Sequence, residues 1–187
     1  MFRLARGVTV TKRADARRNE KALLDAAAAA FVESGVDAPV RDIAARAGVG
    51  VGTIYRHFPA RNDLIVAVFR HQVEECAAAG PELLATSASP HAALGRWIEI
   101  FADFLVTKHG LPEALNAGDL HAYFLERLVP VCAEILGAAT AAGQIVPGVN
   151  PVGLLRGVGN LCIGAGRDDG YDARQMIGFL VEGLRRA

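Results

Sequence analysis

Apolar residues recur at intervals of three and four along nearly the whole chain, and this spacing restricts the possible folds more than any other feature. It places apolar side chains on one face of an α-helix, whereas a half-buried strand shows strict alternation. Segments 16–34, 62–79, 91–108 and 119–142 carry the helical spacing, and we find neither alternation nor Val/Ile/Thr clusters. The sequence therefore predicts an all-α protein of about nine helices.

Glycine and proline indicate where several helices begin and end. Gly35 and Gly48 occupy positions typical of helix C-caps, and Gly80-Pro81 is typical of a loop. Asn150 followed by Pro151 indicates a helix start, because Asn caps free amides and Pro fits the first turn.

The end of the chain and its longest expected helix carry further signals. Asp172 with Gln175 three residues later indicates a capping box for a last helix over 173–186. Pro130 lies inside the helical pattern of 119–142, so we expect a kink or a break there.

Composition excludes several classes of protein. With 187 residues, 52% hydrophobic and 21% charged, the chain can bury a core as one large or two small domains, which excludes disorder. Charges interrupt every apolar stretch before the roughly 18 to 20 residues of a membrane span. The first ten residues lack the apolar run of a signal peptide, so we expect a cytoplasmic protein. Cys76, Cys132 and Cys162 are widely spaced and are expected as reduced core residues.

The formal net charge is zero, but the charge is unevenly distributed. Residues 1–18 contain six Arg or Lys side chains and one Asp. This composition predicts a basic flexible arm over residues 1–15 that meets a polyanion, with a merely solvated tail as the alternative.

Two short helical segments, 40–47 and 51–57, are separated by Gly48-Val49-Gly50. This is the size of a helix-turn-helix, whose second helix enters the DNA major groove. Apolar residues would hold the two helices together: Ile43, Ala44, Ala47, Val49 and Ile54. Polar side chains on the second helix can reach phosphates or base edges, so the segment predicts DNA binding.

The stretch from Val40 to Leu64, with Gly-Thr-Ile-Tyr-Arg-His-Phe at its centre, resembles the DNA-binding signature of the TetR family of bacterial transcriptional regulators. The resemblance covers roughly residues 16–70, and residues 71–187 share only the helical layout. It implies a DNA-binding domain over 16–62 and an effector-binding and dimerisation domain, a helical bundle, over 63–187.

The resemblance also implies a set of DNA-binding residues: Val51, Gly52, Thr53, Tyr55, Arg56, His57 and Arg61. Val51 faces bases in such proteins, Gly52 allows close approach, and Thr53 contacts base or phosphate. Tyr55 and His57 match phosphate contacts, and Arg61 stands where the family usually has Lys. We expect Arg56 to pair locally or point away.

Three positions depart from the family pattern. Gly50 replaces the Ser or Thr that usually caps the second helix, Ala38 and Pro39 replace hydroxyl residues, and Asn62 replaces Glu. Each lost hydroxyl removes a potential phosphate contact.

An aromatic stripe in the second half is either ordinary core or the lining of an effector site: Trp97, Phe101, Phe104, Tyr123, Phe124 and Cys162. Small-molecule sites are mostly apolar with a few polar groups, for which His121, Arg156 and Asn160 are candidates. This pattern predicts a small, largely apolar effector. We further expect Trp97 to pack over the helix 62–79.

The last two helices carry glycines at positions 153, 157 and 164 and apolar residues at 177, 180, 181 and 184. Glycines spaced by four permit close helix approach, and the resemblance implies a homodimer that pairs these helices in a four-helix bundle.

The resulting interpretation is a ligand-responsive repressor that binds a pseudo-palindromic DNA operator as a homodimer. A DNA-binding regulator without an effector remains an alternative, and a helical-bundle enzyme is a weaker one. The chain lacks the Glu-x-x-His pairs of di-metal bundles, a phosphate-binding loop and a nucleophile elbow. Its histidines are dispersed, so we expect no catalytic residues, metal or cofactor.

Overall fold

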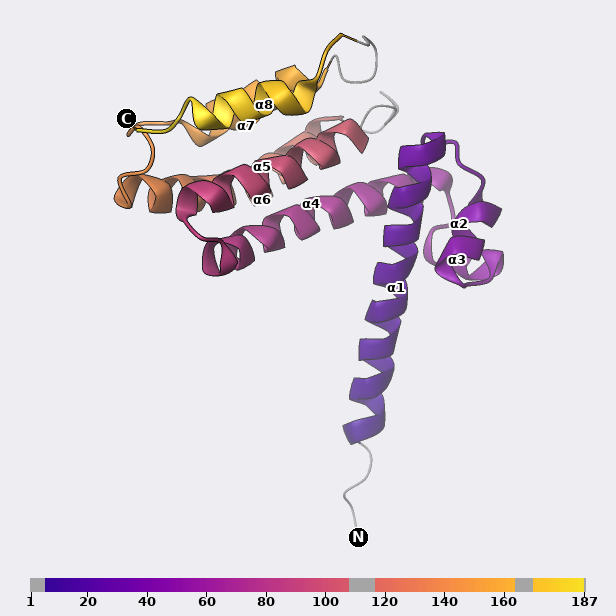
Figure 1. Ribbon diagram of the computed structural model, residues 1–187. Coiled ribbons are helices and arrows are strands. Elements are labelled where there is room, and N and C mark those ends of the chain that lie inside the picture. Colours follow the sequence, from indigo (N-terminus) through magenta and orange to yellow (C-terminus); the bar gives the residue numbers. More distant parts are fainter. Residues whose placement is uncertain (1–5, 108–116, 164–169, 187) are drawn as a thin grey trace. The chain divides into compact units, whose positions relative to one another are not determined.

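A computed structural model describes residues 6–107, 117–163 and 170–186, with side chains from residue 18 onward and not for 106–118. The described residues form eight helices, where about nine were expected, and the expectation of an all-α fold is confirmed (Figure 1). The helices are α1 (Arg6–Ser34), α2 (Val40–Ala47), α3 (Val51–His57), α4 (Arg61–Thr86), α5 (Pro90–Thr107), α6 (Ala117–Ala141), α7 (Pro151–Cys162) and α8 (Ala173–Glu182). None of these helices has the length and hydropathy needed to cross a membrane.

The chain divides into two compact units, residues 1–71 and 72–187. The division lies inside α4, so this helix belongs to both units, whereas the sequence placed the boundary near its first residues.

In the first unit, α1 extends further toward the N-terminus than expected. Residues 6–15, expected as a flexible arm, are helical, because the segment contains no proline and several strong helix formers. Leu23, Ala27 and Phe31 are buried on one face of α1. Val32, which follows Phe31 in the expected helix 16–34, is 63% exposed and does not belong to this buried face.

The two short helices have the predicted bounds. Gly48 ends α2 with a φ of 67°, a left-handed conformation that favours glycine, and thereby turns the chain into α3. Ile43, Ala44 and Ile54 are buried between the helices, as predicted. Proline commonly takes the first helical position, but Pro39 is the N-cap of α2.

In the second unit, α5 and α6 lie between the pair α7–α8 and the later part of α4 (Figure 1). The largest fully buried side chains here come from α5 and α6: Trp97, Phe101, Leu94, Ile98, Leu128 and Ile135.

The expected loop at Gly80-Pro81 is wrong, because α4 continues through both residues to Thr86. A Cβ atom on Gly80 would lie 2.2 Å from Cγ1 of Val131, so the glycine permits close approach of α4 and α6. Pro81 removes one helical amide donor, yet the packing of α4 on its neighbours maintains the helix.

A kink or a break was expected at Pro130, and α6 passes through this residue without a break. The sequence also suggests a short turn over 112–117, between the expected helices 91–108 and 119–142. This segment lies outside the described residues, except that Ala117 begins α6.

Both predicted caps of the last helices are confirmed. Oδ1 of Asn150 accepts a 2.8 Å hydrogen bond from the Gly153 amide, and Oδ1 of Asp172 accepts one of 3.1 Å from Gln175. However, α8 ends at Glu182 and not near residue 186.

The residues after α8 pair with the α6–α7 connection. The Val146 amide donates to the Leu184 carbonyl at 2.9 Å, and the Arg186 amide donates to Gln144 at 3.0 Å. Ile145 and Arg185 form an isolated antiparallel bridge. This pairing ends the helix, so Leu184 does not lie on the last helix as predicted.

Candidate nucleic-acid interface and effector pocket

Helix α3 presents polar side chains to solvent. Tyr55 is 52% exposed, and its hydroxyl makes no hydrogen bond with the described residues. His57 is also exposed, near the C-terminal end of the helix. Gly52 is exposed at the first turn, with no atom within 4 Å of the position of a Cβ, and Val51 and Thr53 are half-buried beside it. The helix thus exposes the side chains of Tyr55 and His57 for hydrogen bonding, and at Gly52 it exposes backbone that no side chain covers.

Arg56 makes local contacts, as expected from its position on the helix. Its Nε donates to the Gly52 carbonyl at 3.1 Å, and its Nη2 donates to Thr53 Oγ1 at 3.3 Å. The guanidinium therefore lies along α3 and binds Thr53, which is itself one of the predicted DNA-binding residues.

The guanidinium of Arg61, for which the family resemblance implied a phosphate contact, binds backbone carbonyls in this structure. Its Nε donates to the Val36 carbonyl at 2.8 Å, and Nη2 donates to the carbonyls of Val36 and Ala38, the latter at 2.6 Å. Its part-buried guanidinium thus binds the α1–α2 connection to the first turn of α4. Every residue has a backbone carbonyl, so the sequence does not show which carbonyl a distant side chain will bind. This role of Arg61 could therefore not be predicted.

Arg46, on the second turn of α2, pairs with Glu33 near the end of α1. Nη1 donates to Oε1 of Glu33 at 2.8 Å, and Nη2 donates to Oε2. The hydrogen bond from Arg46 holds the pKa of Glu33 below its usual value. This two-point pair fixes α2 against α1 and thereby helps to position α3.

The second unit contains a pocket of about 210 Å³ bounded by α5, α6 and α7. Its lining residues are Phe101, Leu105, His121, Phe124, Leu125, Val152, Leu155, Arg156, Gly159 and Asn160. The lining is mainly apolar, and it includes no carboxylate among the described residues.

This pocket brings together five of the residues singled out in the sequence: Phe101, Phe124, His121, Arg156 and Asn160. The other four aromatic-stripe candidates lie elsewhere. Trp97, Phe104 and Cys162 are buried, and the Tyr123 hydroxyl donates to Glu74. Burial raises the pKa of the thiols of Cys76 and Cys132 to about 12 and also raises the pKa of Cys162.

Two chains of contacts connect the pocket walls to α4. The Phe101 ring stacks on Trp97 with centroids 6.0 Å apart and planes 7° apart. The Trp97 Nε1–H then donates to the Cys76 carbonyl of α4 at 2.9 Å, so the predicted packing of Trp97 on this helix is confirmed.

The second chain runs through α6. Arg127 donates to Glu74 of α4 from Nε at 2.7 Å and from Nη2 at 2.6 Å, beside the Tyr123 hydroxyl. These hydrogen bonds, with that from Arg127 the dominant cause, lower the pKa of Glu74 and keep its carboxylate charged.

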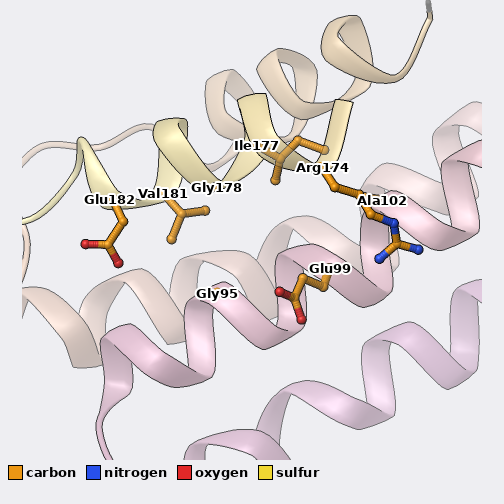
Figure 2. Close-up of a pocket in the computed structure, with 8 residues that line it drawn as sticks. All are labelled: Gly95, Glu99, Ala102, Arg174, Ile177, Gly178, Val181 and Glu182. Carbon is orange, nitrogen blue, oxygen red and sulfur yellow. The ribbon is translucent and has the colours of Figure 1, made fainter. Parts of the chain in front are cut away.

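A separate groove lies between α5 and α8 and is shown in Figure 2. Ile177 and Val181 line it on the side of α8 that faces Gly95 and Ala102 of α5 (Figure 2). Both side chains are buried within the protomer, which corrects their assignment to a dimer surface. Leu180 lies 3.8 Å from the position of a Cβ on Gly157, so this glycine brings α7 and α8 of one chain together. Gly164 lies outside the described residues.

Several pocket residues were not predicted from the sequence: Leu105, Leu125, Val152, Leu155 and Gly159. Ordinary aliphatic side chains carry no functional signal of their own. The helix start at Asn150 and Pro151 does fix the register of α7, and helical spacing from there places Val152, Leu155 and Gly159 near Arg156.

The paired helices α2 and α3, the left-handed turn at Gly48 and the exposed polar face of α3 define a helix-turn-helix DNA-binding protein. Residues 23–68 match the family model of bacterial regulatory proteins of the TetR family. A TetR transcriptional regulator from Streptomyces coelicolor is 30% identical with a TM-score of 0.78, and the match covers 90% of this chain and 99% of that one.

Two curated relatives come from Mycolicibacterium smegmatis. The HTH-type transcriptional repressor LfrR is 36% identical over 110 residues, which are 57% of this chain and 58% of LfrR. The HTH-type transcriptional activator FasR is 35% identical over 92 residues, which are 49% of this chain and 41% of FasR. The chain therefore matches less than two thirds of either relative.

The chain belongs to the TetR family of bacterial regulatory proteins. Membership of this family classes it as a DNA-binding transcriptional regulator and not as an enzyme.

Proposed function

We propose that the chain is a ligand-responsive repressor that binds a pseudo-palindromic operator as a homodimer. One observation carries the proposal: Trp97 stacks on Phe101 of the pocket wall and donates a hydrogen bond to α4, and the first part of α4 belongs to the helix-turn-helix unit. An occupant of the pocket can therefore act on the same helix that supports DNA recognition. As a regulator of transcription, the protein acts where DNA is, in the cytoplasm.

On the DNA side, α3 enters the major groove. Val51, Gly52 and Thr53 lie on its first turn and face the bases, whereas Tyr55 and His57 contact phosphates. The Tyr55 side chain is exposed and its hydroxyl has no hydrogen-bond partner among the described residues, which supports this assignment. Arg56 and Arg61 act instead by positioning α3 and its surroundings, because their guanidinium groups already bind protein oxygens.

On the ligand side, the pocket of α5, α6 and α7 takes the effector. Phe101 and Phe124 contact the ligand, and the rings of Trp97 and Phe104 pack against these two side chains. The effector binds better to the state of the protein that does not fit the operator, and so shifts the population away from DNA. A coupling of about 1–3 kcal/mol changes operator affinity roughly 5- to 150-fold.

The dimer forms through the outward faces of α7 and α8. Phe179 of α8 is 63% exposed and Ile163, at the end of α7, is 58% exposed. Large apolar side chains at this exposure favour a covering partner. A second copy of the same pair of helices supplies one, because twofold symmetry lets the same surface cover itself.

The name of one relative, LfrR, supports repression, whereas FasR is named as an activator. We favour repression because release by a ligand requires only that the ligand disfavour the DNA-binding state. A transcription assay on a promoter that carries the operator distinguishes repression from activation.

The test begins by selecting operator duplexes from a random library. Binding is then compared for the wild-type chain and for Tyr55→Phe, which removes only the hydroxyl. We expect Tyr55→Phe to weaken binding to the operator and to random duplex alike, since phosphate contacts carry no sequence information. Thr53→Val is the matched comparison, and it should change the preferred sequence.

The expected loss for Tyr55→Phe is about 0.5–1.5 kcal/mol, the net value of one hydrogen bond. Fluorescence anisotropy at fixed salt measures it, because the affinity depends on ionic strength. Equal affinity of Tyr55→Phe and wild type for every duplex would contradict the proposed docking of α3.

A further inference from the structure

We infer that the pocket of α5, α6 and α7 is selective for compact monocarboxylates, with the carboxylate at Arg156 and an aromatic body against Phe101 and Phe124. This inference rests on the proposed function, because it specifies the ligand class of the proposed effector site. It is drawn from the charge, hydrogen bonding and size of the pocket.

The polar groups of the pocket lie on two elements. Arg156 and Asn160 are one helical turn apart on α7, and His121 lies on α6. None of the three side chains makes a hydrogen bond or ion pair with a described residue. Arg156 thus offers five N–H donors, and the side chains of Asn160 and His121 add further polar groups.

The charge of the lining favours an anion. Arg156 is the sole permanently charged residue among the described lining residues, and no Asp or Glu is among them. A planar guanidinium binds a carboxylate through two parallel hydrogen bonds, which a neutral ligand cannot reproduce. A cationic ligand would lack a counter-charge in this lining.

The shape of the body follows from the aromatic rings. Phe101 and Phe124 have centroids 5.7 Å apart, and His121 stacks on Phe124 with planes 15° apart. Flat rings prefer offset-stacked or edge-to-face partners, so an aromatic body fits this wall. The pocket volume is about 210 Å³. A cavity of about 150 Å³ is large enough to bind benzene, so a ligand body of one or two rings fits this pocket.

A three-ligand comparison tests the charge requirement on the full chain without DNA. The probes are 2-naphthoate, 2-naphthamide and 2-naphthylmethylammonium, which share one aromatic body and differ in charge. Isothermal titration calorimetry measures each affinity. We expect 2-naphthoate to bind at least tenfold more tightly than the amide, and the ammonium compound to bind least.

Substitutions then assign the preference to Arg156. Arg156→Gln should weaken 2-naphthoate about 10- to 100-fold, the range for hydrogen bonds to a charged group, and change 2-naphthamide less than twofold. Arg174→Gln is the matched control, because Arg174 is an exposed arginine that lines the other groove. It should leave all three affinities unchanged.

A second variant tests the location of the body. Gly159 lines the pocket, and a Cβ there would lie 4.0 Å from Leu105 Cδ1, so Gly159→Leu fills space without a close clash at its first atom. It should weaken 2-naphthoate and 2-naphthamide together, while circular dichroism reports an intact helical fold.

The inference is overturned if the amide or the ammonium compound binds as tightly as the carboxylate, or if Arg156→Gln leaves 2-naphthoate binding unchanged. DNA release is measured separately, with the selected operator. Binding through Arg156 without any change in operator affinity would support the ligand class and contradict the effector role under the proposed function. Loss of operator binding in the ligand-free protein would contradict the proposed function alone.

Discussion

Arg61 shows how one side chain can hold a connection that is distant from it in the sequence. Its guanidinium binds the carbonyls of Val36 and Ala38, which lie in the connection before α2. The planar guanidinium of arginine can donate to two acceptors at once, whereas the ammonium of a lysine is a single compact charge. An arginine at this position therefore has a local structural reason.

We predict that Arg61→Met destabilises the protein by about 1–3 kcal/mol, because two part-buried carbonyls lose their donor. Arg61→Lys should lose less, since one ammonium can reach one carbonyl. Urea denaturation followed by circular dichroism measures both changes. Unchanged stability in Arg61→Met, together with a salt slope of DNA binding reduced by about one, would return Arg61 to the phosphate-contact role.

Some residue roles in the pocket could be predicted and others could not. His121, Arg156 and Asn160 were found because polar side chains at helical spacing near an aromatic stripe are unusual. The roles of Trp97 and Arg61 were missed in part, because each donates to a backbone carbonyl distant in the sequence. The sequence contains no signal for such a partner.

At the scale of the element, α3 begins without a side-chain cap. Gly50 has φ −74° and ψ 144°, an extended conformation that serine and aspartate also adopt, and a Cβ there meets only Thr53 Oγ1 at 3.9 Å. The conformation therefore does not require glycine. Ser or Asp at this position can accept a hydrogen bond from an amide of the first turn.

We predict that Gly50→Ser and Gly50→Asp each stabilise the protein by a few tenths of a kcal/mol. Their effects on DNA should differ. Serine adds a hydroxyl that can donate to phosphate, so Gly50→Ser should bind random duplex more tightly, whereas the carboxylate of Gly50→Asp should weaken binding at low salt. Thermal melts and anisotropy titrations measure the two effects, and equal DNA affinities for the two variants would place this helix start away from phosphates.

Two helical glycines should respond to alanine with opposite signs. Gly80→Ala places a methyl 2.2 Å from Val131 Cγ1, whereas the Cβ of Gly137→Ala on α6 meets nothing within 4 Å. We predict a loss of about 1–3 kcal/mol for Gly80→Ala from overpacking, and a gain of up to about 1 kcal/mol for Gly137→Ala from helix propensity. Chemical denaturation measures both, and a stabilised Gly80→Ala would mean that α4 and α6 can separate at no cost.

Helix ends were predictable where a local residue determines them. Gly48 ends α2, and Asn150 and Asp172 accept hydrogen bonds from amides in the first turns of α7 and α8. In each case the partners lie within a few positions in the sequence, and all three residues act as predicted. Gly80-Pro81 was predicted as a loop because the contact with Val131 is distant in the sequence. The early end of α8 was missed for the same reason, since it depends on pairing with residues 144–146.

For the whole molecule, the assignment of side chains to the inside or the outside of one protomer determines where a second copy can bind. The sequence suggested both Ile177 and Val181 for the dimer surface, but both face α5 (Figure 2). Their spacing of four places them on one face of α8, and periodicity alone does not say which face is turned inward. Phe179, two positions away from each, is the exposed apolar residue.

We predict that Phe179→Lys yields a folded monomer that binds the operator weakly, because a lysine in a dimer surface buries an unpaired charge. Phe179→Leu should remain a dimer. Val181→Lys should instead destabilise the protomer itself. Sedimentation velocity and thermal melts separate these outcomes, and a Phe179→Lys protein that stays dimeric would place the interface on another surface.

The burial of all three thiols determines how this protein can be studied. Cys76, Cys132 and Cys162 are each nearly inaccessible, and their raised pKa values keep them as thiols at neutral pH. Only thiolates react readily with alkylating reagents. A single cysteine introduced on exposed α3 would therefore take a spin label selectively, with the natural cysteines left in place. In a dimer, the distance between two such labels can be compared directly with the roughly 34–36 Å between successive major grooves.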